Sequence, residues 1–109
     1  MASCSGLRHY REGMTLLEIN QLKEATLSFD KAIKLNNDNW EYFFYRGNAL
    51  RVQKLYLKSI PDYHKALELL ETDNYWVYNN LGESYNGVGE HELAIKYLKK
   101  PLQLIQQNE

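Results

Sequence analysis

The stretch Tyr78–Tyr85 reads YNNLGESY and places Gly82 between Leu81 and Tyr85 in a helix-forming segment. A glycine inside a helix costs roughly 1 kcal/mol relative to alanine, so something at this position requires the missing side chain. Glycine recurs at nearly the same spacing, because Gly13, Gly47 and Gly82 are 34 and 35 residues apart. The stretch therefore belongs to an internal repeat.

Further columns of the repeat keep their size class. Each of the three glycines is followed by a small residue and then by a large one, which are Ala25, Ser59 and Ala94, and Phe29, Tyr63 and Leu98. A fixed period of this length is typical of proteins built from stacked supersecondary units. We therefore expect one domain over residues 1–109 with repeats at about 6–39, 40–74 and 75–109, and disorder in residues 1–5.

Each repeat contains two segments with helical periodicity, separated by a short polar break. The predicted helices are Leu7–Ile19, Leu22–Leu35, Trp40–Gln53, Leu57–Leu70, Tyr75–Val88 and Glu92–Ile105. Two antiparallel helices approach closely only where their side chains are small. We therefore expect Gly82 to pack close to Ala94 on the following helix, in an all-α chain.

The third repeat has the clearest motif, with an aromatic residue, Leu-Gly, a tyrosine, a small residue and a large one: Tyr78, Leu81, Gly82, Tyr85, Ala94 and Leu98. This pattern resembles the tetratricopeptide repeat (TPR) over about residues 6–105. The resemblance implies a right-handed superhelical solenoid of three antiparallel helix pairs. Glu12 and Arg46 depart from the motif, because they replace its leucine, and we expect them either to pair across neighbouring repeats or to reach solvent.

The two prolines fall inside predicted helices, where proline removes a backbone donor. Because Pro61 is tolerated mainly in a first turn, we expect its helix to start late, near Ser59, with Ser59 and Asp62 as cap residues. Pro101 lies further inside the last helix, and we expect a kink or break near 99–100.

The sequence offers no catalytic or metal-binding constellation. His9, His64 and His91 lie far apart and lack metal-ligand spacing, so we expect structural or solvated roles for them. Lys and Arg number 13 against 14 Asp and Glu, which gives no excess positive charge for nucleic acid. We therefore expect a non-enzymatic protein with no cofactor, no metal and no nucleic-acid partner, and a helical RNA-binding repeat is the weakest alternative.

Cysteine use and hydropathy bear on location. Cys4 is the only cysteine, so no internal disulfide is available, and we expect its thiol to be solvated. No apolar run approaches the roughly 20 residues of a membrane-spanning helix. We expect a cytoplasmic protein without membrane insertion.

The family resemblance implies a protein-interaction scaffold or adaptor that binds a peptide of a partner in a concave groove. The implied groove residues come from the first helix of each repeat: Tyr10, Met14, Leu17, Phe44, Asn48, Arg51, Trp76, Asn79, Asn80 and Glu83, with Leu7, Glu41, Val52 and Asn86 in further groove columns.

The groove residues suggest how a peptide is held. We expect an extended or helical peptide with apolar anchors over Tyr10, Met14 and Phe44, and a backbone held by amides, which both donate and accept hydrogen bonds. Those amides are Asn48, Asn79 and Asn80. The alternative is that some of the aromatic residues only fill space between helices.

One subclass of ligand is disfavoured. Co-chaperones of this family bind an acidic C-terminal tail through cationic and asparagine residues, and the matching columns here hold Tyr10, Met14, Tyr45, Trp76 and Asn80. Because the cations are missing, we expect such a peptide to bind poorly.

An alternative function of a different class is self-association. An apolar stripe on the last helix contains Leu98, Leu102, Leu104 and Ile105. Exposed apolar stripes mark association sites. Two copies would then form a homo-oligomer through the C-terminal helix, stacked or helix-exchanged, or the chain would be a fragment of a longer repeat array.

Overall fold

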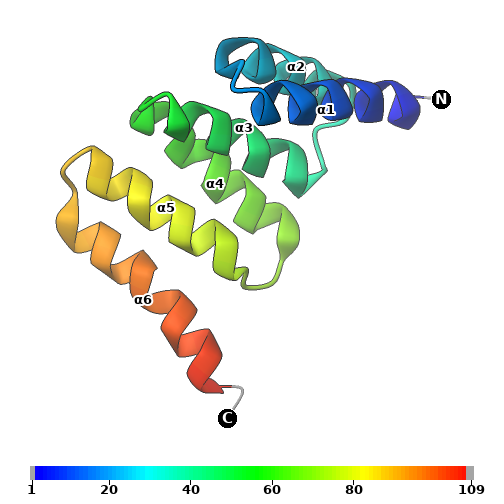
Figure 1. Cartoon of the computed structure of the whole chain (residues 1–109). Helices are drawn as coiled ribbons and strands as arrows, with labels where there is room; N and C mark the ends of the chain where they lie inside the picture. The colour runs from blue at the N-terminus through cyan, green and yellow to red at the C-terminus, as the bar shows by residue number, and fades with distance from the viewer. Residues whose placement is uncertain (1, 108–109) are drawn as a thin grey trace.

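The computed structural model describes residues 2–107, with side chains over 6–101. Within that span every regular element is a helix (Figure 1). The helices are α1 (Ala2–Glu18), α2 (Leu22–Leu35), α3 (Trp40–Val52), α4 (Tyr56–Leu70), α5 (Tyr75–Gly87) and α6 (His91–Gln107). The predicted helices therefore match to within two residues, except at the first boundary.

The first helix begins at Ala2, ahead of its predicted start at Leu7. It therefore includes residues 2–5, for which the sequence led us to expect disorder; Met1 lies outside the described residues. Residues 2–5 read ASCS and contain no proline, glycine or β-branched residue to end a helix. The helix consequently continues toward the N-terminus.

The helices form three hairpins that follow one another from α1 to α6 (Figure 1). Within the hairpins α1 packs on α2, α3 on α4, and α5 on α6. Successive hairpins meet where α2 contacts α3 and where α4 contacts α5. We call these contacts the first joint and the second joint. The predicted all-α solenoid of three antiparallel helix pairs is confirmed.

The turn inside each hairpin has one geometry. Asn20, Lys54 and Gly89 have φ values of 64°, 66° and 85°, so the turn residue is left-handed each time. In the first turn the N–H of Gln21 donates to the carbonyl of Leu16 at 2.8 Å, and the other two turns repeat this bond. This is the Schellman ending, which satisfies the last helical carbonyls and reverses the chain.

Asparagines start the first helix of the second and third hairpins. The side chain of Asn39 accepts from the N–H of Glu41 at 3.0 Å. Asn74 accepts from the N–H groups of Trp76 and Val77 at 3.0 and 3.2 Å. These caps satisfy amide groups that otherwise lack a partner at a helix start.

The repeated glycine makes room for a large side chain on its partner helix. A β-carbon on Gly82 would lie 2.6 Å from Cγ of Leu98, and one on Gly13 would lie 2.6 Å from Cε1 of Phe29. The carbonyl oxygen of Ala94 is further away, at 3.2 Å. The close approach to the helix of Ala94 is as expected, but the large residue one turn later is what fills the space above the glycine.

The expectation of a late start at Pro61 is wrong, because α4 runs unbroken from Tyr56 to Leu70. Proline fits helical φ and removes only its own donor to the carbonyl of Leu57. The side chain of Leu57 is 75% exposed, so this carbonyl stands on a side of the helix that water can reach. The cost to the helix is therefore reduced.

The two residues expected to cap that helix have other roles. The hydroxyl of Ser59 is hydrogen-bonded to the carbonyl of Tyr56 at 2.8 Å and meets the hydroxyl of Ser84 at 2.8 Å. The carboxylate of Asp62 accepts two hydrogen bonds from Arg46, at 2.9 and 2.8 Å. Both residues are buried and tie α4 to neighbouring helices instead of starting it.

The last helix also continues past its proline, so the predicted break near 99–100 is wrong. Pro101 is buried, and its missing donor leaves only the carbonyl of Tyr97 without its helical partner. A kink at this point stays a prediction. The side chains of the apolar stripe beyond Pro101 lie outside the described residues.

The first joint is ionic at its centre. Arg46 of α3 holds Asp62 of α4 and also donates to Asp30 of α2 at 2.9 Å. Gln53 adds a hydrogen bond to the hydroxyl of Thr26 at 3.1 Å. The expected pairing of Arg46 across neighbouring repeats is therefore confirmed.

Glu12 occupies the same column in the first repeat but stays within its own helix. Its carboxylate is 4.0 Å from Nε of Arg8 and 3.6 Å from Nδ1 of His9. Its side chain is 52% exposed. Of the two expectations for this residue, exposure to solvent is the one that the structure matches.

The second joint is apolar at its centre. Leu81, in the column of Arg46, is fully buried in a cluster with Phe43, Tyr63 and Val77. Polar groups add the Ser59–Ser84 contact and a 2.8 Å hydrogen bond between Nε2 of His64 and the hydroxyl of Tyr85. The main core therefore spans the second and third hairpins.

Candidate functional site

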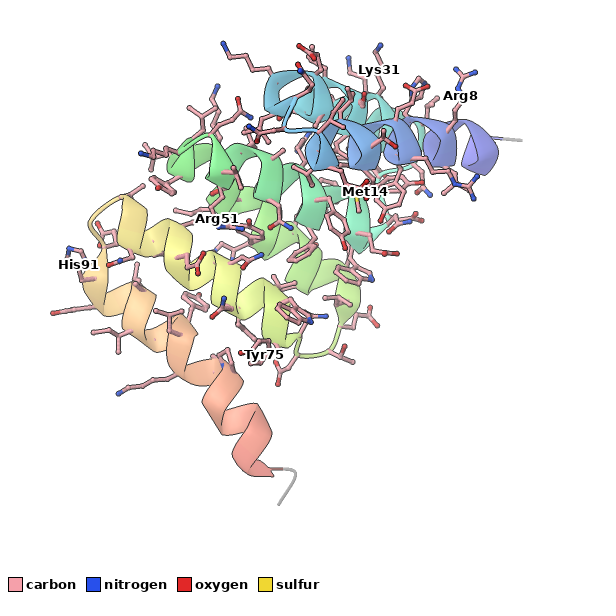
Figure 2. The ribbon with its side chains drawn as sticks, viewed as in Figure 1. Arg8, Met14, Lys31, Arg51, Tyr75 and His91 are labelled. Atoms are coloured by element: carbon pink, nitrogen blue, oxygen red, sulfur yellow. The ribbon has the colours of Figure 1, made fainter. Side chains whose placement is uncertain are left out.

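The residues predicted to line a groove all lie on the first helix of a hairpin, that is on α1, α3 or α5. Figure 2 labels Met14 on α1 and Arg51 on α3 among them. Several of them belong to one of two groups with different chemistry, a polar group between α3 and α5 and an aromatic group between α1 and α3, whereas Trp76 and Asn79 belong to neither.

The polar group is a hydrogen-bond network that connects three helices. The hydroxyl of Tyr63 on α4 donates to Oδ1 of Asn48 at 2.6 Å and accepts from Nε of Arg51 at 3.1 Å. Nδ2 of Asn80 on α5 donates to the same Oδ1 at 2.8 Å. Nη1 of Arg51 donates to Glu83 at 3.0 Å. We call these five residues the amide network.

The network fixes which amide atoms remain available. Both bonds to Asn48 use its oxygen, and the bond from Asn80 uses its nitrogen. Within the described residues, Nδ2 of Asn48 and Oδ1 of Asn80 make no hydrogen bond. One donor and one acceptor are thus left unused on two amides that are bonded to each other, and a peptide unit can bond to both kinds of group.

Tyr63 keeps its proton under ordinary conditions. Burial raises its pKa to about 12, and the charge and hydrogen bond of Arg51 act in the opposite direction. The hydroxyl therefore stays a donor to Asn48 and holds the amide in one orientation. Arg51, in turn, is neutralised by Glu83.

The aromatic group surrounds Tyr10. Its ring is stacked on Tyr42 with centroids 5.1 Å apart, and it meets Tyr45 edge-on at 5.9 Å and Phe29 at 6.1 Å. Burial, followed by the charge of Glu41, raises the pKa of Tyr10. Such clusters present rigid contact area at low entropic cost.

The predicted apolar anchors differ in accessibility. Phe44 is only 7% exposed and belongs to the main core, where it meets Tyr45 and Tyr63. Met14 and Leu17 are half-buried beside a smaller cluster around Phe29. Phe44 therefore fills space between helices and has little surface to offer a ligand.

The most accessible aromatic residue of the set is Trp76, at 65% exposure. It lies at the start of α5 and meets the ring of Tyr75 edge-on with centroids 5.2 Å apart. Asn79 lies one turn further along α5 and is half-buried. The structure does not join either residue to the amide network by a hydrogen bond.

Sequence reasoning missed the contribution of Tyr63, because it comes from the second helix of its repeat. A signal existed: Phe29, Tyr63 and Leu98 share one column, and only the tyrosine carries a hydroxyl. A buried tyrosine hydroxyl needs a partner. The polar residues across the hairpin were the available partners.

The three histidines lie apart. His64 bonds to Tyr85, and His91 bonds through Nδ1 to Asn86 at 2.6 Å. Nδ1 of His9 is buried and has no hydrogen-bond partner in the part of the chain that the structure describes. Within the same part, no group of three potential ligands could hold a metal ion.

Two hollows are lined by residues outside the amide network. One, of about 740 Å³, is on α1 and is lined by Leu7, Arg8, Arg11, Glu12, Thr15 and Leu16. Another, of about 480 Å³, lies over the first joint between Asp30 and Pro61. Of the helices described, none combines the length and apolar character needed to cross a bilayer.

Comparison with family models identifies the repeat. The model of the tetratricopeptide repeat matches residues 8–39 and 77–108, which are parts of the first and third hairpins. A curated relative, an uncharacterized TPR repeat-containing protein of Arabidopsis thaliana, is 33% identical over 99 residues, or 84% of this chain. The chain spans only 12% of that relative's length.

Solved structures share the fold along most of the chain. The TPR domain of Arabidopsis OM64 has a TM-score of 0.91 at 21% identity, with 100% of this chain and 89% of that one covered. The first TPR of Spaghetti (RPAP3), solved bound to the HSP90 peptide SRMEEVD, has a TM-score of 0.87 at 20% identity, with 94% and 80% covered. At these identities the likeness concerns the fold alone.

Proposed function

Because the chain belongs to the tetratricopeptide repeat family, we propose that it is a non-enzymatic adaptor whose α1, α3 and α5 face binds a peptide segment of a protein partner. The observation that carries this proposal is the unused donor of Asn48 and the unused acceptor of Asn80, on two amides that are bonded to each other. Packing within the core does not require an unused donor and acceptor, whereas a peptide backbone can bond to both.

The peptide that fits this face has an apolar or aromatic side chain next to a plain stretch of backbone. Trp76 offers a large, exposed ring on α5, and Tyr10 and Met14 offer apolar surface on α1. Asn79 supplies a further amide beside Trp76. Aromatic residues of this kind often dominate binding energy when a ligand covers them.

Charge argues against a strongly acidic peptide. The peptide bound to the Spaghetti TPR carries two glutamates and an aspartate. Here the matching columns hold Tyr10, Met14, Tyr45, Trp76 and Asn80, and Arg51 is already paired with Glu83. An acidic peptide would therefore lose hydration without gaining an unpaired cation.

The test begins with selection of ligands from a phage-displayed library of random linear peptides on the intact chain. The tightest peptide is then titrated calorimetrically against the wild type and against Trp76→Ala, Asn79→Ala and Asn48→Ala. We expect each variant to bind roughly tenfold more weakly, because each removes a contact worth about 1–2 kcal/mol. The peptide SRMEEVD serves as the acidic comparison and should bind poorly.

The matched control is Leu57→Ala, which truncates an exposed side chain on α4. It should leave the affinity unchanged. Unchanged affinity in both asparagine variants would remove the backbone grip. Loss of affinity in Leu57→Ala with none in Trp76→Ala would place the site on another face and contradict the proposal.

A further inference from the structure

The two joints inside the chain define which columns meet when one repeat stacks on the next. In the first joint, Asp30 of α2 pairs with Arg46 of α3, and Thr26 bonds to Gln53. In the second joint His64, in the column of Asp30, reaches α5 by its bond to Tyr85. The column of Asp30 and His64 therefore faces the next repeat in both joints.

The corresponding columns on α1 and α6 have no neighbour of this kind. In the described residues the backbone of α1 lies close to α2 and α3, and that of α6 lies close to α5, with Tyr97 of α6 also meeting His64 of α4. Figure 1 shows these two helices at opposite ends of the stack. The surfaces that would receive a preceding and a following repeat are thus both uncovered within residues 2–107.

The charged column is complementary between the two ends. Glu12 of α1 stands 34 residues before Arg46, and Lys99 of α6 stands 69 residues after Asp30, which is one step of 34 and one of 35. In the first joint the acidic residue lies on α2 and the basic residue lies on α3. At the two ends of the chain the signs are exchanged, because the basic residue lies on α6 and the acidic residue lies on α1. Both residues are exposed. A repeated joint would bring Lys99 to Glu12.

The apolar column is complementary as well. Ile19 lies 34 residues before Gln53, and Ile95 lies 69 residues after Thr26. Ile19 is 60% exposed and Ile95 is 53% exposed. Two isoleucines are thus left in solvent at the two positions that touch each other in the first joint. Burying them together would be favourable.

The shape of α1 fits the same contact. The hollow of about 740 Å³ on this helix is lined by Glu12 and Leu16, which lie in the columns of Arg46 and Leu50 at the first joint. Arg8 at its edge points away from the rest of the molecule (Figure 2). The hollow therefore lies on the face of α1 that corresponds to the faces by which α3 contacts α2 and α5 contacts α4.

We infer that a second copy of this chain docks head to tail, with α6 of one copy against α1 of the next. Ile95 then covers Ile19, and Lys99 pairs with Glu12. Because the two surfaces differ, the contact is heterologous, and its repetition extends the stack instead of closing a dimer. The four residues named at this contact are not among those proposed to hold a peptide.

Sedimentation velocity over a concentration series of the wild-type chain tests the association. We expect the average mass to rise continuously with concentration, because an open contact adds copies without limit. A chain that stays monomeric at every concentration overturns the proposal. So does a dimer that does not grow further, which is the behaviour of exchanged helices.

Charge reversal tests the geometry. Glu12→Lys and Lys99→Glu each place like charges at the contact, and we expect each to weaken association roughly tenfold. An equimolar mixture of the two variants restores opposite charges at every contact between unlike copies. The mixture should therefore associate like the wild type, with the two variants alternating along the stack.

Lys31→Glu is the matched control, since Lys31 is exposed on α2 and points away from its neighbours (Figure 2). It should associate like the wild type, and thermal unfolding should show that all variants fold. Single variants that associate normally, or a mixture that fails to recover, overturn the head-to-tail contact even if the chain self-associates by another route.

Discussion

The two joints of this chain have the same geometry and opposite chemistry. At one column, the first joint carries Arg46, and the second carries Leu81. The arginine is held by two carboxylates at 2.8–2.9 Å, whereas the leucine is fully buried among apolar side chains. Stacking of helical hairpins therefore depends on matched columns and not on a particular residue type.

The two joints should differ in how well they tolerate single substitutions. Apolar packing loses energy in proportion to the atoms removed. A buried ion pair contributes little net stability when intact, but it becomes costly when one partner is missing. The side chain of Asp62 is only 6% exposed, so its charge depends on Arg46. The first joint should therefore be the more fragile one toward single substitutions.

Removal of the arginine alone should have the largest effect. We expect Arg46→Met to lower the free energy of unfolding by about 3 kcal/mol, because it leaves the carboxylate of Asp62 buried without a cation. The double variant Arg46→Met, Asp62→Leu should recover most of this loss, since it converts the first joint to the chemistry of the second. Urea unfolding followed by circular dichroism measures both.

Lys31→Met, which removes an exposed charge from α2, is the control and should change stability little. Were the double variant as unstable as the single one, the ion network would contribute net stability to the joint. Apolar side chains could then not replace the ionic centre of the first joint, and the idea that either chemistry serves at this column would be contradicted.

The hairpins on either side of the second joint allow a finer test. A β-carbon at Gly82 would lie 2.6 Å from the branched Cγ of Leu98, whereas one at Gly47 would lie 3.0 Å from the ring of Tyr63. We expect Gly82→Ala to cost about 2 kcal/mol and Gly47→Ala less, because overpacking outweighs the helix-propensity gain only where the clash is severe.

Gly6→Ala provides the matched control, because its new β-carbon would meet only ordinary contacts at 3.4–3.5 Å. It should raise stability by about 0.5–1 kcal/mol through helix propensity. Thermal and urea unfolding of the three variants gives the order directly. Stabilisation by Gly82→Ala would mean that Leu98 moves freely, and the close approach would not require glycine.

The sequence predicts the fold well because the fold depends on columns. The spacing of Gly13, Gly47 and Gly82 and the polar breaks locate six helices to within two residues, except at the start of the first helix. The helix boundaries predicted from the two prolines were wrong, because the prediction counted the lost backbone donor and ignored where the carbonyl without a partner lies. At Pro61 that carbonyl belongs to the exposed Leu57, so the helix continues.

The candidate site is less predictable, since it depends on contacts between repeats. Column positions place Asn48 and Asn80 on the right helices, but only the folded chain shows that Tyr63 bonds to Asn48 and that Asn80 bonds to the same oxygen. The burial of Phe44 also depends on neighbours from α4. A groove column in one repeat becomes a core position when a large residue from the adjacent helix covers it.

The smallest expected effect concerns pH and separates the two joints once more. Burial lowers the pKa of His64, whose Nε2 is bonded to Tyr85 in the second joint. A protein folds more favourably with the neutral form of a base whose pKa is lowered in the folded state, so this contribution to stability is present above the ordinary pKa of about 6.5 and is lost as the pH falls below it.

We expect the melting temperature to decline on acidification from neutral pH, and His64→Gln to reduce that slope. Hydrogen exchange locates the effect, because α5 should lose protection before α3, whose joint is built on Arg46 and contains no histidine.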